Sequence, residues 1–312
     1  MNIKKRTLYF TGTVTLLLLL SSFSYAAFSE KDSGTRAAQF LKLPVGAKPI
    51  GMGEAYTAIA DDVNALFYNP AGLAQLKRKS GEFMFSKYIG ETSYEWIAIG
   101  LPISKKAGAL GIGIQYFSAG SMDETTVNAQ QVGSFTPSDL AVHLAYAKQL
   151  GNFPLGLNLK FIQSKIKETA TSFALDLGSQ YVSKESKLLL GFSLQNLGDG
   201  LKYENEKSKL PILIKLGIGS KINKQWLVSM DGVFPEDNSP TFGAGTEYKI
   251  LLSKEIHFSL RAGYNSRSRK SDGLNGVTTG FGFQFKSVNL DYAWIPLGNL
   301  GDSHRFSLGF KY

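Results

Sequence analysis

A strict alternation of apolar and polar residues, repeated along most of the chain, is the feature that most limits its possible fold. It is clearest over residues 304–312, where the apolar side chains share one face of an extended segment. Such segments begin near Ser80, Ser93, Gly108, Ser138, Phe153, Ser172, Lys187, Ile212, Trp226, Pro240, Glu255, Leu274, Val288 and His304. An even number of strands of about ten residues each is typical of transmembrane barrels. The pattern therefore predicts an all-β, transmembrane antiparallel β-barrel of about fourteen strands over residues 80–312.

The links between these segments differ in length in a regular way. Short links lie near Ser104, Asn152, Ser183, Asn223, Ser253 and Ser287, and long links cover 121–137, 198–211, 265–273 and 295–303. Transmembrane barrels have short periplasmic turns and longer outer loops. A soluble sandwich or propeller, the alternative for alternating strands, needs no such asymmetry. The long links fall consistently on one side, which favours the membrane barrel.

Aromatic residues lie near the ends of many segments. They are Tyr94, Tyr116, Tyr146, Trp226, Tyr248, Tyr264, Trp294 and Tyr312. Rings at these positions are expected to form the girdles that transmembrane barrels place at both membrane interfaces. The opposite faces of the strands carry mainly small or polar residues, as a wet or plugged lumen requires.

The first residues have the features of a secretory signal peptide. Basic residues precede an apolar run from Leu8 to Phe23, and small residues at Ser24 and Ala26 suit cleavage after Ala26. An uncleaved anchor helix is the alternative. We therefore expect a signal peptide over 1–26, an N-terminal hatch over 27–79 and the barrel over 80–312, in the outer membrane of a Gram-negative-type bacterium.

Residues 28–79 do not alternate, and they are too apolar for a solvated periplasmic tail. We expect a short amphipathic helix from Thr35 to Leu43, an extended patch from Ile50 to Gly53 and a helix from Glu54 to Phe67. The turn that starts at Asn69-Pro70 is predicted to end the second helix and direct the chain into the barrel wall. The economical location for this partly helical segment is the lumen, as a hatch. A periplasmic appendage is the alternative.

Charged and titratable residues on the polar strand faces are expected to line the lumen. They are Lys160, Asp176, Lys215, Asp231, Glu247, His257, Arg261 and Asp291. Both signs occur, so these side chains can pair with each other and with the hatch. A polar gate around an apolar pocket is the functional alternative.

Enzymatic chemistry has little support in the sequence. There is no Cys, there are three His, and no phosphate-binding loop, Gly-x-Ser-x-Gly or zinc-protease motif occurs. The pair Asp61 and Asp62, with Asn64, could offer oxygen ligands to a metal, but capping of a helical turn is the favoured role. The net charge of +9 is spread over short turns and forms no nucleic-acid stripe. We expect no enzyme, metal, cofactor or nucleic-acid partner.

One stretch, from Gly34 to Leu76, resembles the N-terminal signature of the PorV/PorQ family. The matching elements are Ala-x-Phe-Leu at 38–41, Gly-Ala-x-x-x-Gly-Met-Gly-Glu-Ala at 46–55, Ala-Asp-Asp at 60–62 and Asn-Pro-Ala-Gly-Leu at 69–73. That family is similar to the FadL-like fourteen-stranded outer-membrane transporters. The resemblance implies a hatch-filled barrel that either moves hydrophobic small molecules or serves the type IX secretion system.

Passive transport of hydrophobic or amphipathic small molecules is the leading functional hypothesis. A PorV-like role in docking secreted proteins or their pore, and a structural barrel with a sealed lumen, are the alternatives. The expected ligand contacts, in part by resemblance, are Phe40, Leu41, Leu43, Ile50, Met52, Asn69, Pro70, Ala71 and Gly72. The terminal aromatics Phe310 and Tyr312 resemble the signal that the outer-membrane insertion machinery reads. Outer-membrane lipid and this machinery are therefore the expected general partners.

Overall fold

The computed structural model describes residues 30–87, 91–104, 106–183, 187–203, 206–268, 276–298 and 301–312. The signal peptide predicted over 1–26 lies outside these residues and stays a prediction. Fourteen strands form one closed barrel: β1 (Ser80–Lys87), β2 (Ser93–Ser104), β3 (Gly108–Ser118), β6 (Ser138–Leu150), β7 (Phe153–Lys165), β8 (Thr169–Val182), β9 (Leu188–Gly198), β12 (Leu213–Lys221), β13 (Trp226–Pro235), β14 (Thr241–Leu251), β15 (Ile256–Asn265), β16 (Val277–Phe285), β17 (Val288–Pro296) and β18 (Asp302–Lys311).

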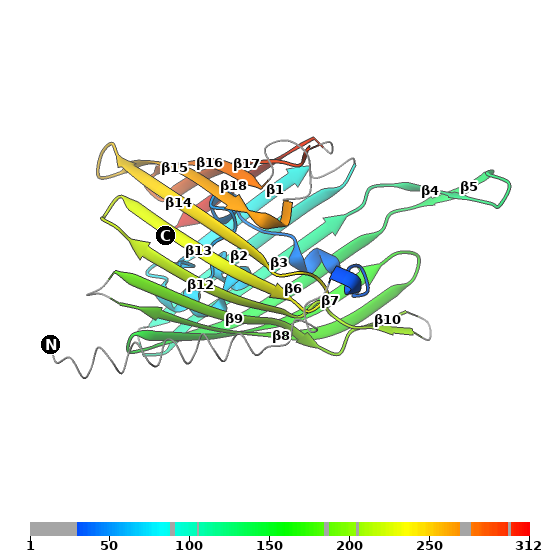
Figure 1. Cartoon of the computed structure of the whole chain (residues 1–312), viewed down its shortest axis with the longest axis horizontal. Coiled ribbons are helices and arrows are strands. Elements are labelled where there is room, and N and C mark those ends of the chain that lie inside the picture. The colour runs from blue at the N-terminus through cyan, green and yellow to red at the C-terminus, as the bar shows by residue number, and fades with distance from the viewer. Residues whose placement is uncertain are drawn as a thin grey trace.

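Each barrel strand pairs antiparallel with its neighbours in the chain, and β1 pairs with β18 to close the ring (Figure 1). The closing register runs from Ser80 opposite Lys311 to Phe85 opposite Phe306. Closure leaves no sheet edge with unpaired backbone groups, which a lipid environment would penalise heavily. The predicted fold class is confirmed. The predicted segment start at Leu274 lies outside the described residues.

The strands present an apolar surface outward and a polar or small surface inward. In β3, Ile112 and Ile114 are 48% and 38% exposed, whereas Gly111, Gly113 and Gln115 between and beside them are buried. This is the alternation that a barrel in lipid needs, because its outer face replaces the hydrophobic core of a soluble protein. No helix among the described residues is long and apolar enough to cross a membrane.

The long links carry structure that the sequence analysis did not predict. The hairpin of β4 (Met122–Thr125) and β5 (Gln131–Phe135) extends beyond the barrel, as Figure 1 shows. A second hairpin pairs β10 (Leu201–Tyr203) with β11 (Glu206–Ser208), and a 3-10 turn, η5 (Ser266–Ser268), follows β15. The predicted asymmetry holds, since the links after β2, β6, β8, β12, β14 and β16 are short.

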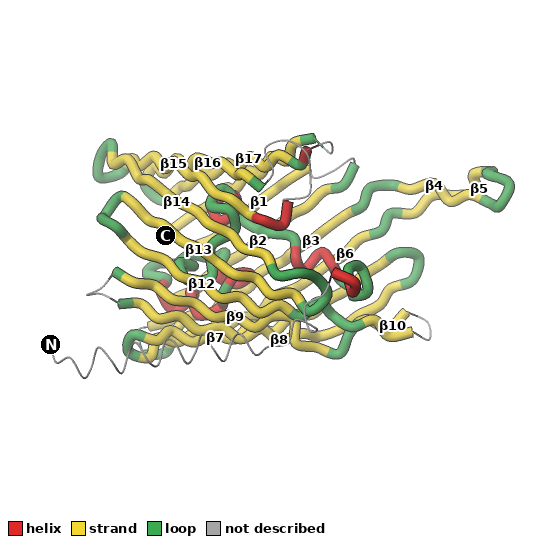
Figure 2. Tube along the Cα trace, in the orientation of Figure 1, coloured by secondary structure: helices red, strands yellow, loops and turns green. Residues whose placement is uncertain are grey.

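The segment before β1 occupies the lumen in short turns, visible inside the strands in Figure 2. Its elements are η2 (Glu30–Asp32), η3 (Gln39–Lys42), α2 (Ala47–Ile50), α3 (Ala65–Tyr68) and η4 (Pro70–Gln75). From here on, "hatch" means residues 30–79. The helix predicted from Thr35 to Leu43 is wrong, because Ala38 adopts a left-handed conformation (φ 51°) and only one 3-10 turn follows. The patch expected to be extended at Ile50–Gly53 instead ends α2 and turns.

The helix predicted from Glu54 to Phe67 is also wrong, since only its last residues enter α3. Glu54 has a positive φ of 63°. Beyond it, the backbone forms separate short turns, such as the Ala60 N–H donating to the Tyr56 carbonyl, and its remaining groups bond to the wall. The Tyr56 and Thr57 N–H groups donate to the Asp231 carboxylate, at 3.0 and 2.8 Å. The Gln180 amide donates to the Thr57 and Ala60 carbonyls. Wall side chains thus satisfy buried groups that a helix would otherwise pair internally.

One predicted girdle ring is placed wrongly. Tyr94 points into the lumen and is fully buried, and its hydroxyl donates to the Leu43 carbonyl at 2.8 Å. Its strand alternates in the opposite sense from the one assumed, with Tyr94 and Trp96 inside and Ile97 outside. Trp226, Tyr248 and Tyr312 do face outward, at 45%, 44% and 72% exposure. The other inward ring of β2 also contacts the hatch, since Trp96 Nε1 donates to Asn64 Oδ1 at 3.1 Å.

Candidate functional site: the hatch and the outer cavity

Polar side chains of the wall hold the hatch by its backbone. Ser229 donates to the Ala55 carbonyl at 2.7 Å, Asn158 to the Leu66 carbonyl at 3.2 Å, and Gln195 to the Phe67 carbonyl at 2.6 Å. All three wall residues are buried. Hydrogen bonds to buried carbonyls avoid the cost of leaving those groups unpaired. At this depth the lumen is therefore filled by the hatch, which is bonded to specific wall side chains, and is not a water-filled channel.

Wall glycines let the hatch backbone approach without an intervening layer of side chains. A Cβ on Gly245 would overlap the Met52 carbonyl, and one on Gly263 would overlap the Gly53 amide. A Cβ on Gly156 would likewise overlap the turn at Pro70 and Ala71. Because the overlapping atoms are backbone, no side-chain movement relieves the clash. These close contacts at the wall glycines fix the depth and rotation of the hatch.

The turn at Asn69 is built as its sequence suggests. Asn69 is extended (φ −163°), and its side chain accepts the Ala71 N–H at 3.2 Å while Pro70 starts η4. The Asn69 amide also donates to the Thr57 and Ser179 carbonyls, each at 2.9 Å, so it joins two parts of the hatch to β8. Gly72 packs against the Ala60 backbone with no room for a Cβ.

The predicted apolar contacts of the hatch are packed into cores. Phe40 and Leu41 lie in a cluster with Ile162, Ala174 and Leu210 of the wall and outer links. Ile50 and Met52 are fully buried in the main core, and Leu43 packs partly buried against both clusters. None of these five residues lines the outer cavity described below.

Most of the predicted lumen charges pair with one another. The Lys160 ammonium lies 2.7 Å from the Asp176 carboxylate, and Arg261 bridges Glu247 at 2.7 Å and Asp291 at 2.6 Å. All five are at least nine-tenths buried. His257 is half-buried on β15, opposite Gln284 of β16. Opposite charges at hydrogen-bond distance offset their desolvation, so these groups connect strands rather than face a ligand.

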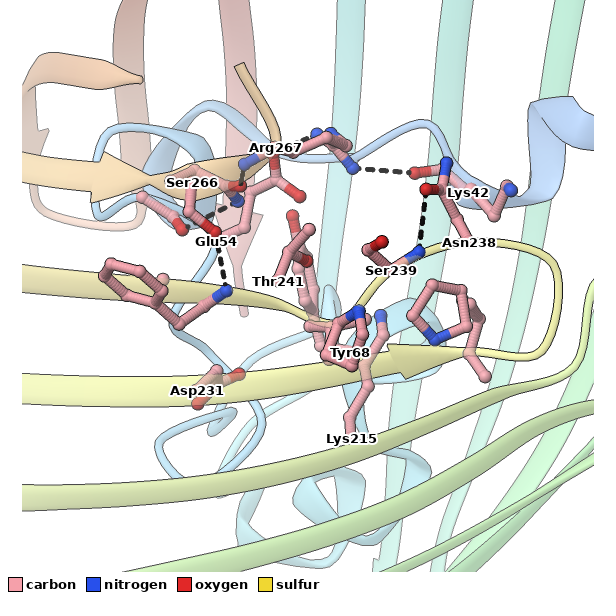
Figure 3. Close-up of a pocket in the computed structure, with 18 of the residues that line it drawn as sticks. Lys42, Glu54, Tyr68, Lys215, Asp231, Asn238, Ser239, Thr241, Ser266 and Arg267 are labelled. Atoms are coloured by element: carbon pink, nitrogen blue, oxygen red, sulfur yellow. Dashed lines mark hydrogen bonds and ion pairs between the residues drawn. The ribbon is translucent and has the colours of Figure 1, made fainter. Parts of the chain in front are cut away.

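An outer cavity of about 290 Å³ opens at the end of the barrel that carries the long loops (Figure 3). Its lining combines hatch residues with the outer ends of β12 to β15. Apolar walls come from Phe67, Leu213, Val233 and Phe242, together with the ring of Tyr68. Two of the predicted lumen charges, Lys215 and Asp231, also line it.

Three cationic residues line this cavity: Lys42 and Arg267, which are each paired with a carboxylate, and Lys215 in the wall. The Lys215 ammonium lies 5.0 Å from the centre of the Phe67 ring and 5.4 Å from that of Tyr68. The residue is 7% exposed and makes no salt bridge with any carboxylate in the described part of the chain. Cation–π contacts partly replace hydration at such a site. A solute in the cavity would meet apolar walls, the Lys215 ammonium and the Asp231 carboxylate.

Two ion pairs tie the hatch to the cavity rim. Arg267 pairs with Glu54, and Lys42 pairs with Asp237 at 2.8 Å. Burial opposes ionisation of Asp237, but hydrogen bonds from Lys42 and Gln39 outweigh it and hold the pKa of Asp237 below its usual value. The rim therefore carries a carboxylate that stays ionised at neutral pH and fixes η3 to the β13–β14 loop.

Several residues of this site were missed by the sequence analysis. Phe67 and Tyr68 come at the end of the segment predicted as a helix and were not distinguished within it, and Arg267 lies in a link without periodicity. The wall amides Gln180 and Gln195 could have been found, because they fall on the polar faces of alternating strands. One capping-type contact is present, where Asp62 accepts the Asn64 N–H at 3.1 Å, whereas Asn64, the N-cap of α3, makes no side-chain capping bond. Asp61 instead lies 3.3 Å from the Lys48 ammonium. No group of three or more His, Asp or Glu suited to a metal ion occurs within the described residues.

The architecture is a closed fourteen-stranded barrel filled by an N-terminal hatch, and this fold has solved counterparts. The structure is similar to the Pseudomonas aeruginosa FadL homologue, with a TM-score of 0.55 and 11% identity over 86% of this chain and 98% of that one. It is also similar to the toluene transporters TodX of Pseudomonas putida (0.57, 10%, 85% and 96%) and TbuX of Ralstonia pickettii (0.57, 12%, 86% and 98%). At these identities the likeness shows the fold.

The family follows from the sequence itself. Residues 26–224 match the family described as type IX secretion system protein PorV, and this is well over half of the chain. The protein therefore belongs to the PorV family, as the motifs between Gly34 and Leu76 suggested. No curated protein sequence matches the chain. Family, fold and lipid-facing surface together place the protein in the outer membrane.

Proposed function

We propose that the protein passively transports hydrophobic or amphipathic small molecules across the outer membrane and binds them in the outer cavity. The observation that carries this proposal is the meeting of apolar walls with the Lys215 ammonium in one concave site. Small-molecule sites are typically concave, mostly apolar and equipped with few polar groups. The volume of about 290 Å³ favours a compact solute. The toluene transporters and the monoaromatic hydrocarbon channel CymD, which share the fold, support the same solute class.

In this proposal the cavity residues and the predicted hatch residues have different roles. Tyr68 and Lys215 contact the solute, whereas Phe40, Leu41, Leu43, Ile50 and Met52 hold the hatch in place. The turn from Asn69 to Gly72 fixes α3, and with it Tyr68, against the wall. The paired lumen charges keep the strands in register around the hatch. The hatch backbone packs directly against the wall glycines and fills the centre of the barrel. Passage of a solute therefore requires part of the hatch to move.

Uptake of labelled toluene by cells tests this proposal. Ser239 is exposed at the rim of the outer cavity, so Ser239→Trp should fill its entrance and reduce uptake several-fold. Ser134 is exposed on the β4–β5 hairpin, and Ser134→Trp is the matched control with wild-type uptake. Equal uptake by the wild type and Ser239→Trp, at equal levels of inserted protein, would refute the cavity as the binding site.

The proposal includes no catalytic role. His143, a buried titratable group of the wall, contacts the Asn158 amide at 3.0 Å and packs edge-on against Trp96. It is thus a packing residue with a hydrogen-bond partner rather than a base beside a nucleophile. The matching family and the similar solved proteins are described as secretion proteins, transporters or channels. Purified protein should hydrolyse neither p-nitrophenyl esters nor phospholipids, and turnover of either would contradict this part.

Docking of secreted proteins or their pore is a second candidate function, favoured by family membership and by the β4–β5 hairpin. Met122, Val127 and Val132 on this hairpin are 44%, 102% and 62% exposed, so three apolar side chains of one short hairpin are available to a partner. Replacement of residues 122–135 by a short linker should abolish copurification of secretion-system proteins after gentle extraction and leave toluene uptake intact. A barrel with a permanently sealed lumen, the structural alternative, would show neither activity.

A further inference from the structure

A wide basic hollow lies at the opposite end of the barrel, on the side of the short turns. It encloses about 740 Å³ and is surrounded by six basic side chains. These are Lys77, Arg78, Lys221, Lys254, Lys286 and Lys311. The first two belong to the last residues of the hatch before β1, and the others to the inner ends or turns of the β12–β18 wall. We call this hollow the inner bowl.

The charge of the inner bowl is not balanced from within. All six basic residues are exposed. The carboxylates that line the bowl are Asp61, Asp62 and Glu255. Asp61 and Asp62 are already paired with Lys48, at 3.3 and 3.0 Å. Glu255 lies 3.8 Å from Lys286, with both side chains about 60% exposed, and such exposed pairs contribute little. The other five basic residues form no salt bridge within the described residues.

The bowl faces the periplasm rather than the lipid. Its floor is made by the hatch residues Gln75 and Leu76, and its wall by turns that ring the barrel axis. Lipid headgroups lie around the outer perimeter of a barrel, where apolar side chains such as Phe310 mark the membrane. A partner reaches the bowl along the barrel axis from the periplasmic side.

We propose that the inner bowl binds an acidic segment of a periplasmic protein. The cations come from several separate chain segments and remain exposed, instead of converging on one buried point as in a phosphate or carboxylate site. A distributed basic surface of this kind fits an extended chain of Asp and Glu, and it steers such a chain by long-range attraction. This role is independent of solute transport through the outer cavity.

Binding of a fluorescein-labelled poly-glutamate peptide to the protein in zwitterionic nanodiscs tests the proposal. The triple variant Lys221→Glu, Lys254→Glu, Lys311→Glu reverses charge inside the bowl. The control, Lys106→Glu, Lys148→Glu, Lys224→Glu, makes the same net change at exposed positions near the short turns but outside the bowl. Both variants must run as heat-modifiable barrels on gels.

We expect the bowl variant to lose at least about tenfold in peptide affinity and the control to lose much less. Wild-type affinity should fall as salt rises towards about 0.15 M, where charges are screened beyond about 8 Å. Equal losses in both variants would overturn the proposal, since binding would then follow net charge alone. Displacement of the peptide by inorganic phosphate well beyond that by chloride at equal ionic strength would assign the bowl to a small anion. Binding of phosphatidylglycerol vesicles lost only in the bowl variant, with peptide binding retained, would assign it to lipid.

Discussion

An arginine at Leu260 should destabilise the barrel far more than an arginine at the adjacent Ser259. Leu260 lies in the middle of β15 and is 48% exposed, between Tyr248 and Phe281, which are 44% and 45% exposed on the same outer face. A cation on the lipid face near the midplane costs about 2–4 kcal/mol. Ser259 is 8% exposed and lines a small inner cavity with charged side chains of both signs, among them Glu247 and Asp291, so an arginine there meets a polar lumen instead of lipid.

The difference between the two variants should therefore be at least about 2 kcal/mol, or roughly 30-fold in the unfolding equilibrium constant. Reversible denaturant unfolding in phospholipid vesicles, followed by tryptophan fluorescence, measures it directly. Ala262→Arg, two residues further along the outer face, should behave like Leu260→Arg. Equal free energies of unfolding for Leu260→Arg and Ser259→Arg would show that the register or the membrane position of β15 is wrong.

Deletion of Phe310–Tyr312 should prevent assembly, because the segment closes the barrel against β1 and ends in outward aromatic rings; normal surface levels of the truncated protein would contradict this. The double variant Asn69→Ala, Pro70→Ala should insert but show faster hatch proteolysis or altered toluene uptake, and an inserted variant unchanged in both would make the turn a simple connector. The pKa of Asp237 is lowered in the folded protein, so its stabilising pair with Lys42 is fully present above the unfolded pKa of about 4 and is lost as the pH falls through the folded value. Protection factors for amide exchange at Gln39–Lys42, corrected for the intrinsic pH dependence of exchange, should therefore fall only in strong acid, and a fall near pH 6 would refute the ionic tether.

The barrel could be predicted from sequence because the alternation that specifies it lies within each strand. A strand that faces lipid on one side and a polar lumen on the other must alternate with period two, and each of the fourteen segments shows this without knowledge of its neighbours. Tyr94 was misplaced because a large ring fits either a membrane girdle or a lumen, and only the hatch beside it decides. The two outer hairpins lie in polar links whose pairing is not encoded by a membrane-facing pattern.

The hatch could not be predicted at the same level, since its conformation depends on distant wall residues. Spacing from Glu54 to Phe67 suits a helix, but Asp231 and Gln180 bond its backbone more than a hundred residues away in sequence. The candidate site shares this difficulty. Lys215 and Asp231 could be assigned to the lumen by parity, whereas Tyr68 enters the cavity only because α3 and the Asn69 turn set its position.

The central claim, that a hydrophobic solute occupies the outer cavity, can be tested most directly by diffraction from crystals of the protein soaked with 4-bromotoluene. The account predicts an anomalous bromine peak in the outer cavity, between Tyr68, Phe67 and Leu213, that is absent from crystals of Ser239→Trp. Bromine found only on the lipid-facing surface of the barrel, with the outer cavity empty in the wild type, would contradict it.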